Sequence, residues 1–336
     1  MLKNKSKVLI LALTVVLLLS PMAMNGYSVA QKKFVMKVAY PMGITPDHPH
    51  YFIGHYLKDR IENLTEGKIE VQLFPQSQLG GDRETTEGVM NGTIEMSWPA
   101  SGPMALIVPE LGVLDLPYIF KDVRHAFRVL DSDFGDELAR KCLAKGMRIG
   151  GWSLGGVRQI MTTKKPIYNL EDMKGLKIRV MESPTYIEMM KAWGAIPTPI
   201  AWTEVYMALS QGVVDGQETG VNAALDMKHF DIIKYVALTS EIISIRPMII
   251  SELWWQELPL NLQEAVLKAT GETALLLREK IIEFQGKAIE KAETEYNVTI
   301  TKPELGPWMK ATRAIYPKFA KIVGGQEIID KCLAVE

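Results

Sequence analysis

The chain contains 336 residues, of which 47% are hydrophobic and 23% are charged, and its formal net charge at pH 7 is −1. This balance gives no strong basic field, which argues against a nucleic acid or a membrane surface as the partner. A chain of this length can form two domains with a hydrophobic core each.

Residues 1–30 have the pattern of a secretory signal peptide. Lysines precede a short apolar run, and Ser28-Val29-Ala30 forms a small-x-small cleavage site. The apolar run is short for a membrane span, although an uncleaved anchor is the alternative. We therefore expect the mature chain to begin near Gln31 and to reside in the periplasm.

The first half of the mature chain alternates between strand and helix patterns. Strands are expected over 34–40, 68–74, 94–98 and 147–152, and helices over 51–64, 83–91 and 125–145. Asp82 is the expected N-cap of the second helix. This alternation predicts an α/β fold. The two cysteines, Cys142 and Cys332, could pair in an oxidising compartment, and the sequence leaves that question open.

Two motifs in this half suggest other classes of function. Gly151-Trp152-Ser153-Leu154-Gly155 has the spacing of a nucleophile elbow, so a secreted serine esterase that uses Ser153 is one alternative. An elbow requires a helix directly after the serine, whereas the following GGVRQIMTTKKPI is typical of an extended segment that crosses between domains. Asp47, His48 and His50 could seed the site of a zinc-binding receptor, but no second histidine cluster follows. We expect no metal and no cofactor.

The central stretch, KGLKIRVMESPTYIEMMKAWGAIPTPIAWTEVYMALSQGVVDGQE, predicts strand, helix, strand, helix and strand in succession. The strands are expected over 176–180, 195–200 and 213–218, and the helices over 184–193 and 204–211, with Ser183 and Thr203 as N-caps. Two prolines restrict the middle strand to a sheet edge.

Polar side chains gather at the ends of these strands, where open α/β sheets bind their ligands. A buried arginine such as Arg179 is costly unless an anion meets it, and its planar fork suits a carboxylate or a phosphate. From the residues alone, a ligand anion and a protein carboxylate such as Glu182 or Glu218 are equally good partners.

The last third predicts strands over 235–238 and 242–250 and then a long helix. Asn261, as an N-cap, and Glu264 have capping-box spacing, and the helical pattern continues to about Tyr296. Such a helix would be roughly 50 Å long, more than one small domain needs. Residues 306–333 predict one or two further helices.

The sequence resembles the TRAP-transporter extracytoplasmic solute-binding proteins, the DctP-like family. The resemblance rests on GLKIRV with GAIPTPIAWTEVYMALSQGVVDGQE, and on FPQSQLGGDRETTEGVMNGTIEM and VPELGVLDLPYIFKD in the family's order. It implies an α/β periplasmic binding protein fold of two lobes, with interlobe crossovers and a long C-terminal helix that spans both. Lobe I would comprise residues 31–156 plus about 245–284, and lobe II residues 157–244 plus about 285–336.

The resemblance also implies a function without chemistry on the substrate. Such a receptor binds a small organic anion, closes by a hinge motion and delivers the anion to TRAP membrane subunits. Members of the family are usually monomers, and we expect a monomer here.

The matching positions imply the ligand-binding residues. Arg179 would hold the ligand carboxylate and Arg158 would add a second donor. The other positions implied to contact the ligand are Trp98, Glu182, Trp202, Gln217 and Thr219. Many sialic-acid and dicarboxylate receptors carry Asn at the positions of Glu182 and Thr219. Because a carboxylate beside the arginine would repel a second anionic group, we favour a hydroxylated monocarboxylate, such as a sugar acid or hydroxy acid. A C4-dicarboxylate is the alternative.

Overall fold

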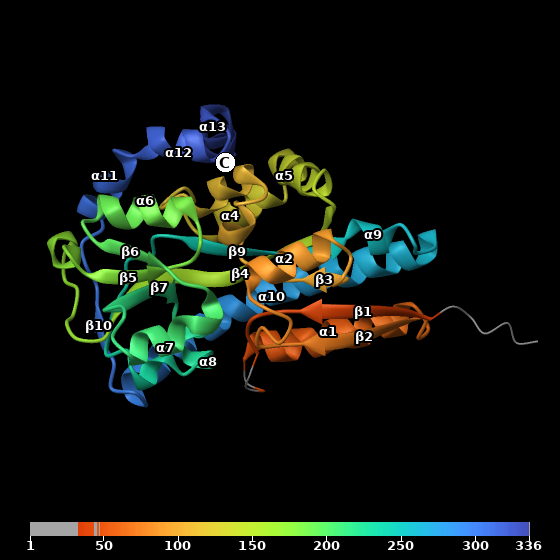
Figure 1. Cartoon of the computed structure of the whole chain (residues 1–336), viewed down its shortest axis with the longest axis horizontal. Coiled ribbons are helices and arrows are strands. Elements are labelled where there is room, and N and C mark those ends of the chain that lie inside the picture. Colours follow the sequence, from red (N-terminus) through yellow and green to blue (C-terminus); the bar gives the residue numbers. More distant parts are fainter. Residues whose placement is uncertain (1–32, 44–45, 47, 336) are drawn as a thin grey trace, which may run out of the picture. The chain divides into compact units, whose positions relative to one another are not determined.

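Ten strands form one mixed sheet in the computed structural model, which describes residues 33–43, 46 and 48–335. The predicted signal peptide lies outside these residues. The strands are β1 (Phe34–Ala39), β2 (Ile69–Phe74), β3 (Met96–Ser97), β4 (Met147–Thr162), β5 (Lys177–Val180), β6 (Ile196–Pro199), β7 (Gly216–Gly220), β8 (Tyr235–Ala237), β9 (Ile243–Ser251) and β10 (Thr299–Thr301). Their order is β2-β1-β3-β9-β4-β7-β5-β6 (Figure 1), and β8 pairs with β4 and β10. The predicted α/β class is confirmed.

Helices and 3-10 turns connect and cover these strands. The α-helices are α1 (Pro49–Leu64), α2 (Asp82–Met90), α3 (Ser101–Met104), α4 (Val123–Leu130), α5 (Asp133–Leu143), α6 (Pro184–Ala192), α7 (Val205–Ser210), α8 (Val221–Asp226), α9 (Glu252–Trp255), α10 (Leu260–Thr294), α11 (Gly306–Arg313), α12 (Tyr316–Ile322) and α13 (Gln326–Ala334). The 3-10 turns are η1 (Pro109–Asp115), η2 (Leu170–Met173), η3 (Trp202–Glu204) and η4 (His229–Asp231).

Strand β4 joins the two halves of the sheet. Its first part, up to Val157, pairs antiparallel with β9, and its last part, from Arg158, pairs with β7 and β8. Figure 1 shows β4 between β9 and β7. Because Ser153 lies in the middle of this continuous strand, no helix follows it and the nucleophile elbow is absent. The serine is fully buried, and its Oγ donates to the carbonyl of Arg246 at 2.5 Å.

The long helix α10 contributes to two hydrophobic clusters. The larger cluster holds β1, β3, most of β9 and the first part of α10 through residues such as Leu262 and Ile281. A smaller cluster around Phe230 receives the end of α10 through Ala288 and Ala292. The predicted long C-terminal helix is confirmed at 35 residues. The residue boundaries of the two lobes stay a prediction.

Several local predictions were wrong: within the described residues three helices and not one or two follow residue 305, the strand expected over 147–152 continues to Thr162, and four helix starts differ. The helix expected over 125–145 is two helices, because Ser132 accepts a hydrogen bond from the backbone N–H of Phe134 and starts α5 as a new helix. Asp82 is the first residue of α2, and Gly81 is the N-cap. The carboxylate of Asp82 does not cap the helix but accepts a hydrogen bond at Oδ1 from Nη1 of Arg246, at 3.3 Å.

The other two also concern caps. Thr203 lies inside η3, so α7 begins later, at Val205. The long helix begins at Leu260 after Pro259, whose fixed φ suits this position, and therefore Asn261 does not cap it. In contrast, β6 is the edge strand that its prolines predicted, since in the described part of the chain it pairs with β5 alone.

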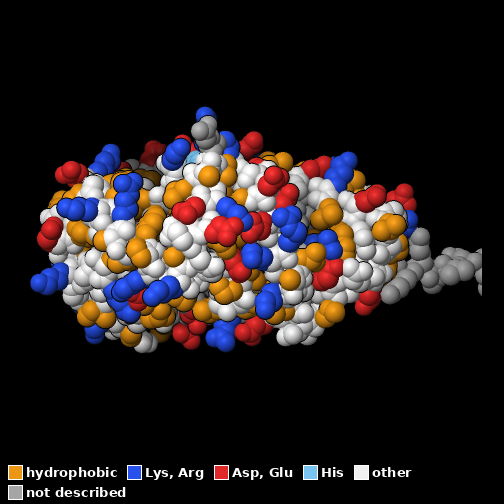
Figure 2. All heavy atoms as spheres, turned by 90° about the horizontal axis from the view of Figure 1, so that it is seen from above, with side chains coloured by type: hydrophobic (Ala, Val, Ile, Leu, Met, Phe, Trp, Pro, Cys, Tyr) orange, Lys and Arg blue, Asp and Glu red, His pale blue; other side chains and the backbone are white. Residues whose placement is uncertain are grey.

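Both cysteines are free thiols in the core, with Cys142 on α5 and Cys332 on α13. Burial raises the pKa of each to about 12, which keeps them protonated and unreactive. On the face shown in Figure 2, positive and negative side chains are interspersed. Within residues 33–335, as far as they are described, no helix is long and apolar enough to cross a membrane.

Candidate ligand-binding site

Three buried arginines from three strands line one cavity: Arg158 on β4, Arg179 on β5 and Arg246 on β9. Their exposed fractions are 4%, 2% and 7%. The cavity has a volume of about 30 Å³, which is room for one or two water molecules. Its walls combine apolar groups with carboxylates, namely Met42, Met181, Ile200, Trp202, Asp82, Glu84 and Glu182.

Arg179 has no carboxylate partner within ion-pair distance in the described part of the chain. Its Nε and Nη2 donate to the carbonyl of Ile200, at 3.0 and 2.8 Å, and its guanidinium lies 5.5 Å from the centre of the Trp202 ring. Burial, together with the nearby charge of Arg158, lowers the pKa of Arg179 to about 10. Because a guanidinium has five N–H groups, its Nη1 and the second N–H of Nη2 stay available to an anion.

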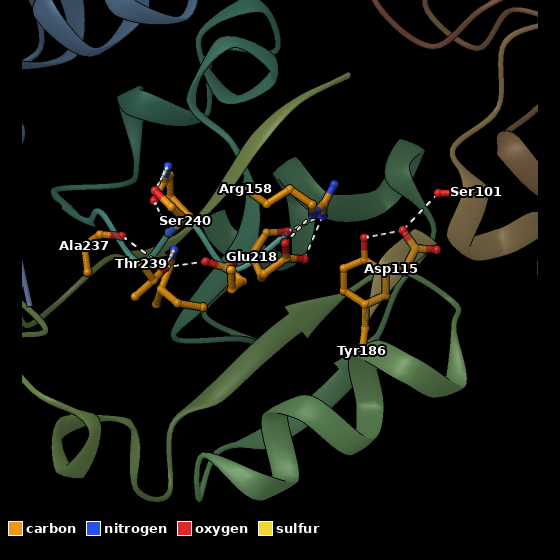
Figure 3. Close-up of polar contacts among 11 residues, drawn as sticks. Ser101, Asp115, Arg158, Tyr186, Glu218, Ala237, Thr239 and Ser240 are labelled. Atoms are coloured by element: carbon orange, nitrogen blue, oxygen red, sulfur yellow. Dashed lines mark hydrogen bonds and ion pairs between the residues drawn. The ribbon is translucent and has the colours of Figure 1, made fainter. Parts of the chain in front are cut away.

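Arg158 is already paired with a protein carboxylate. Its Nε and Nη2 donate to the two carboxylate oxygens of Glu218, and Nη2 also donates to the Glu218 carbonyl at 2.7 Å (Figure 3). Burial opposes the charge of Arg158, but the Glu218 carboxylate outweighs it and raises the pKa of Arg158. Within the described part of the chain no group bonds to Nη1, which is therefore left for a ligand. The structure therefore assigns Glu218 to Arg158 and not to Arg179.

Arg246 is the cavity arginine that sequence reasoning missed. Its Nη1 donates to the carbonyl of Trp98 at 2.9 Å and to Oδ1 of Asp82 at 3.3 Å. A signal was present, since Arg246 interrupts the apolar run Ile242–Ile250, and a buried arginine requires polar partners. The partners themselves, which lie 148 and 164 positions away, could not be read from the sequence.

The predicted site residues divide into two groups. The cavity is lined by Arg158, Arg179, Glu182, Trp202 and Thr219, which come from separate elements and meet here.

Trp98 and Gln217 are not among the described residues that line the cavity. The ring of Trp98 is buried, with its centre 4.9 Å from the centre of the Tyr40 ring. The link to the cavity is the backbone carbonyl of Trp98, which accepts a hydrogen bond from Arg246. Gln217 is buried and its Nε2 lies 2.9 Å from Nδ1 of His229, next to Trp202.

Further buried carboxyl groups lie near Arg158, and Figure 3 shows Asp115 with Tyr186 and Ser101 beside the Arg158–Glu218 pair. Tyr186, whose ring centre is 5.2 Å from the Arg158 guanidinium, donates to Asp115 at 3.1 Å, and Ser101 donates to the same oxygen at 2.9 Å. Burial raises the pKa of Asp115 to about 7 and, with the nearby Glu218, that of Glu241 to about 8. These groups take up protons near neutral pH, so that Arg158 is not surrounded by several full negative charges.

The histidines considered for zinc have structural roles. His48 is the N-cap of α1, where its ring accepts from the backbone N–H of His50, and the two rings stack 5.1 Å apart. Burial lowers the pKa of both. Asp47 lies outside the described residues, and the described ones contain no group of three or more His, Cys, Asp or Glu side chains that could hold a metal ion.

An α/β fold in which three buried arginines line one cavity is suited to binding a small anionic solute. Residues 42–322 match the family model described as bacterial extracellular solute-binding protein, family 7. The chain belongs to this family, the DctP family of TRAP-type extracytoplasmic solute receptors.

Similar proteins agree with this assignment. A sialic acid-binding periplasmic protein of Vibrio cholerae is 31% identical over 287 residues, 85% of this chain and 88% of that protein. A TRAP periplasmic solute-binding protein from Polaromonas sp. JS666, solved with D-erythronate, is 31% identical with a TM-score of 0.86 and covers 90% of this chain and 99% of that one. A protein of the same description from Sulfurospirillum deleyianum, with succinate, is 32% identical with a TM-score of 0.84 over the same shares.

Proposed function

We propose that this receptor binds a small hydroxylated monocarboxylate, such as a sugar acid or hydroxy acid, and that Arg179 holds its carboxylate. The observation that supports this most directly is the lack of a carboxylate partner for Arg179 among the described residues, despite its 2% exposure. A buried, uncompensated cation destabilises a protein, and a ligand anion would relieve that cost. Since the carbonyl of Ile200 accepts from Nε and Nη2 of Arg179, the ligand carboxylate would approach the end of the guanidinium and accept from Nη1 and the second N–H of Nη2.

The other charges of the cavity favour a single anionic group on the ligand. Arg158 is neutralised by Glu218 and Arg246 faces Asp82, so that of the three cavity arginines only Arg179 lacks a carboxylate partner among the described residues. Glu84 and Glu182 add negative charge to the wall. Carboxylates accept hydrogen bonds from ligand hydroxyl groups but repel a second carboxylate. Among the relatives, both a hydroxylated acid and a dicarboxylate occur as ligands, D-erythronate and succinate, so a C4-dicarboxylate is the alternative to be tested.

Ligand exchange would require the two predicted lobes to separate. The cavity of about 30 Å³ would have to widen to admit a four-carbon acid, so the closed form with ligand would be wider at the cavity than this structure. We propose a hinge motion in which the bound acid favours the closed form, and delivery of the acid by a monomeric receptor to TRAP membrane subunits.

The test is calorimetric titration of the mature chain, residues 31–336, with D-erythronate, D-gluconate and succinate. Arg179→Gln should weaken binding of every accepted acid by about 2–5 kcal/mol, roughly 30-fold to several thousandfold. Arg148→Gln is the matched control, because Arg148 makes a two-bond pair with Glu252 away from the cavity. Near-normal binding by the Arg179 variant would exclude its role, and tighter binding of succinate would exclude the preference for hydroxylated acids.

A further inference from the structure

Arg246 lines the cavity, and one edge of its guanidinium has no hydrogen-bonded partner in the described part of the chain. Its Nη1 is held by Trp98 and Asp82, while Nε and Nη2 donate to no group in the described part of the chain. In Arg158 and Arg179, by contrast, Nε and Nη2 are bonded to Glu218 and to Ile200. Of the three cavity arginines, Arg246 alone therefore offers its Nε–Nη2 edge, whose parallel N–H groups match two neighbouring oxygen atoms.

The backbone around Arg246 holds this edge in place. The pairing of β4 with β9 shifts register between Leu154 and Gly156, which makes Gly155 a bulge residue, and such bulges redirect side chains next to binding sites. A Cβ atom at Gly155 would lie 3.2 Å from Nε of Arg246 and 3.0 Å from Oγ of Ser244. The missing side chain thus leaves room for the guanidinium, which explains the last glycine of the Gly-x-Ser-x-Gly motif.

The charge of Arg246 is locally balanced. Its partner Asp82 lies on the same cavity wall, together with Glu84 and Glu182. A second ligand carboxylate at Arg246 would lie beside these acidic groups, whereas neutral hydroxyl oxygens would accept its N–H groups without that repulsion.

We propose that Arg246 is a specificity-determining residue, whose Nε–Nη2 edge donates to two neighbouring hydroxyl oxygens of the ligand. This inference rests on the proposed function, since it takes the carboxylate to be held by Arg179. It predicts a receptor that distinguishes polyhydroxylated acids from acids of the same length without hydroxyl groups.

The test compares D-erythronate with butyrate, a four-carbon acid that lacks hydroxyl groups. We expect Arg246→Lys, which keeps the charge facing Asp82 but loses the two-pronged edge, to weaken D-erythronate binding by about 10-fold to 150-fold, the range for hydrogen bonds from a charged donor. Butyrate binding, measured directly or by competition, should change less than about threefold. Gly155→Ala should reproduce this pattern by displacing the guanidinium, and Arg148→Gln should leave both acids unaffected.

The outcomes separate this inference from the proposed function. Equal weakening for both acids, or unchanged D-erythronate binding by both variants, overturns the role of Arg246 while binding that depends on Arg179 stands. If the wild-type chain binds neither acid nor any other carboxylate, the proposed function fails and the inference fails with it. Urea unfolding of each variant shows whether a loss of affinity reflects a loss of the fold.

Discussion

Replacing Glu218 by Gln would isolate the charge of the buried Arg158–Glu218 pair while keeping the size of the side chain. Both partners are buried, at 4% and 0% exposure. Breaking such a pair by removing one charge costs about 3–5 kcal/mol, because the remaining charge stays buried without compensation. We therefore expect the free energy of unfolding of the ligand-free protein to fall by about this amount.

The control is Glu252→Gln. Arg148 and Glu252 form the same two-bond arrangement, at 2.8 and 2.9 Å, but are 25% and 20% exposed. Pairs in contact with water contribute about 0–1 kcal/mol, so the two variants should differ several-fold in stability loss. Urea unfolding with an unchanged dependence on denaturant gives both values.

For ligand affinity, we expect Glu218→Gln to have the opposite effect. Without Glu218, the charge of Arg158 in the cavity wall is uncompensated, and a ligand carboxylate would partly replace the missing partner. Affinity for D-erythronate, measured by calorimetry, should therefore rise although stability falls. A stability loss no larger than that of Glu252→Gln, or weaker ligand binding, would refute the assignment of Glu218 as the counter-ion of Arg158.

Three further predictions follow from buried groups. Burial raises the pKa of Asp115 to about 7. Above about pH 4 the unfolded chain has released this proton, whereas the folded protein still holds it. The free energy of unfolding of the wild type therefore falls as the pH rises from about 4 to 7. Asp115→Asn should therefore gain stability relative to the wild type by ~1.4 kcal/mol per pH unit in this window, and a pH-independent difference in urea unfolding would contradict this. Cys142 and Cys332 should react with a thiol reagent only after denaturation, in equal amounts with and without prior reduction; native labelling would show that they are accessible. Ser153→Ala removes the donor to the Arg246 carbonyl and should lower the free energy of unfolding by about 1–3 kcal/mol, whereas an unchanged value would mean that this bond contributes nothing.

The secondary structure was largely predictable because its signals are local. The edge position of β6 was predicted from its two prolines, which lack the backbone N–H that a central strand donates to its neighbours. The long helix α10 was predicted from the helical period of its apolar residues. The errors also have local causes. Asp82 and Thr203 are good capping residues by type, but long-range contacts and a 3-10 turn decided where the helices begin.

The sequence by itself determined the α/β class, the family and the arginine at the end of β5 as a candidate for anion binding. Only the tertiary structure decided which buried charges neutralise one another. From the residues alone Glu218 could have been the partner of Arg179, until the antiparallel pairing of β4 with β7 placed Arg158 opposite Gly220 and within reach of Glu218. Ion pairing depends on distances across residues that are about 60 positions apart in the chain, and no local pattern encodes them. The same reason hid Arg246, whose role depends on a bulge in a neighbouring strand.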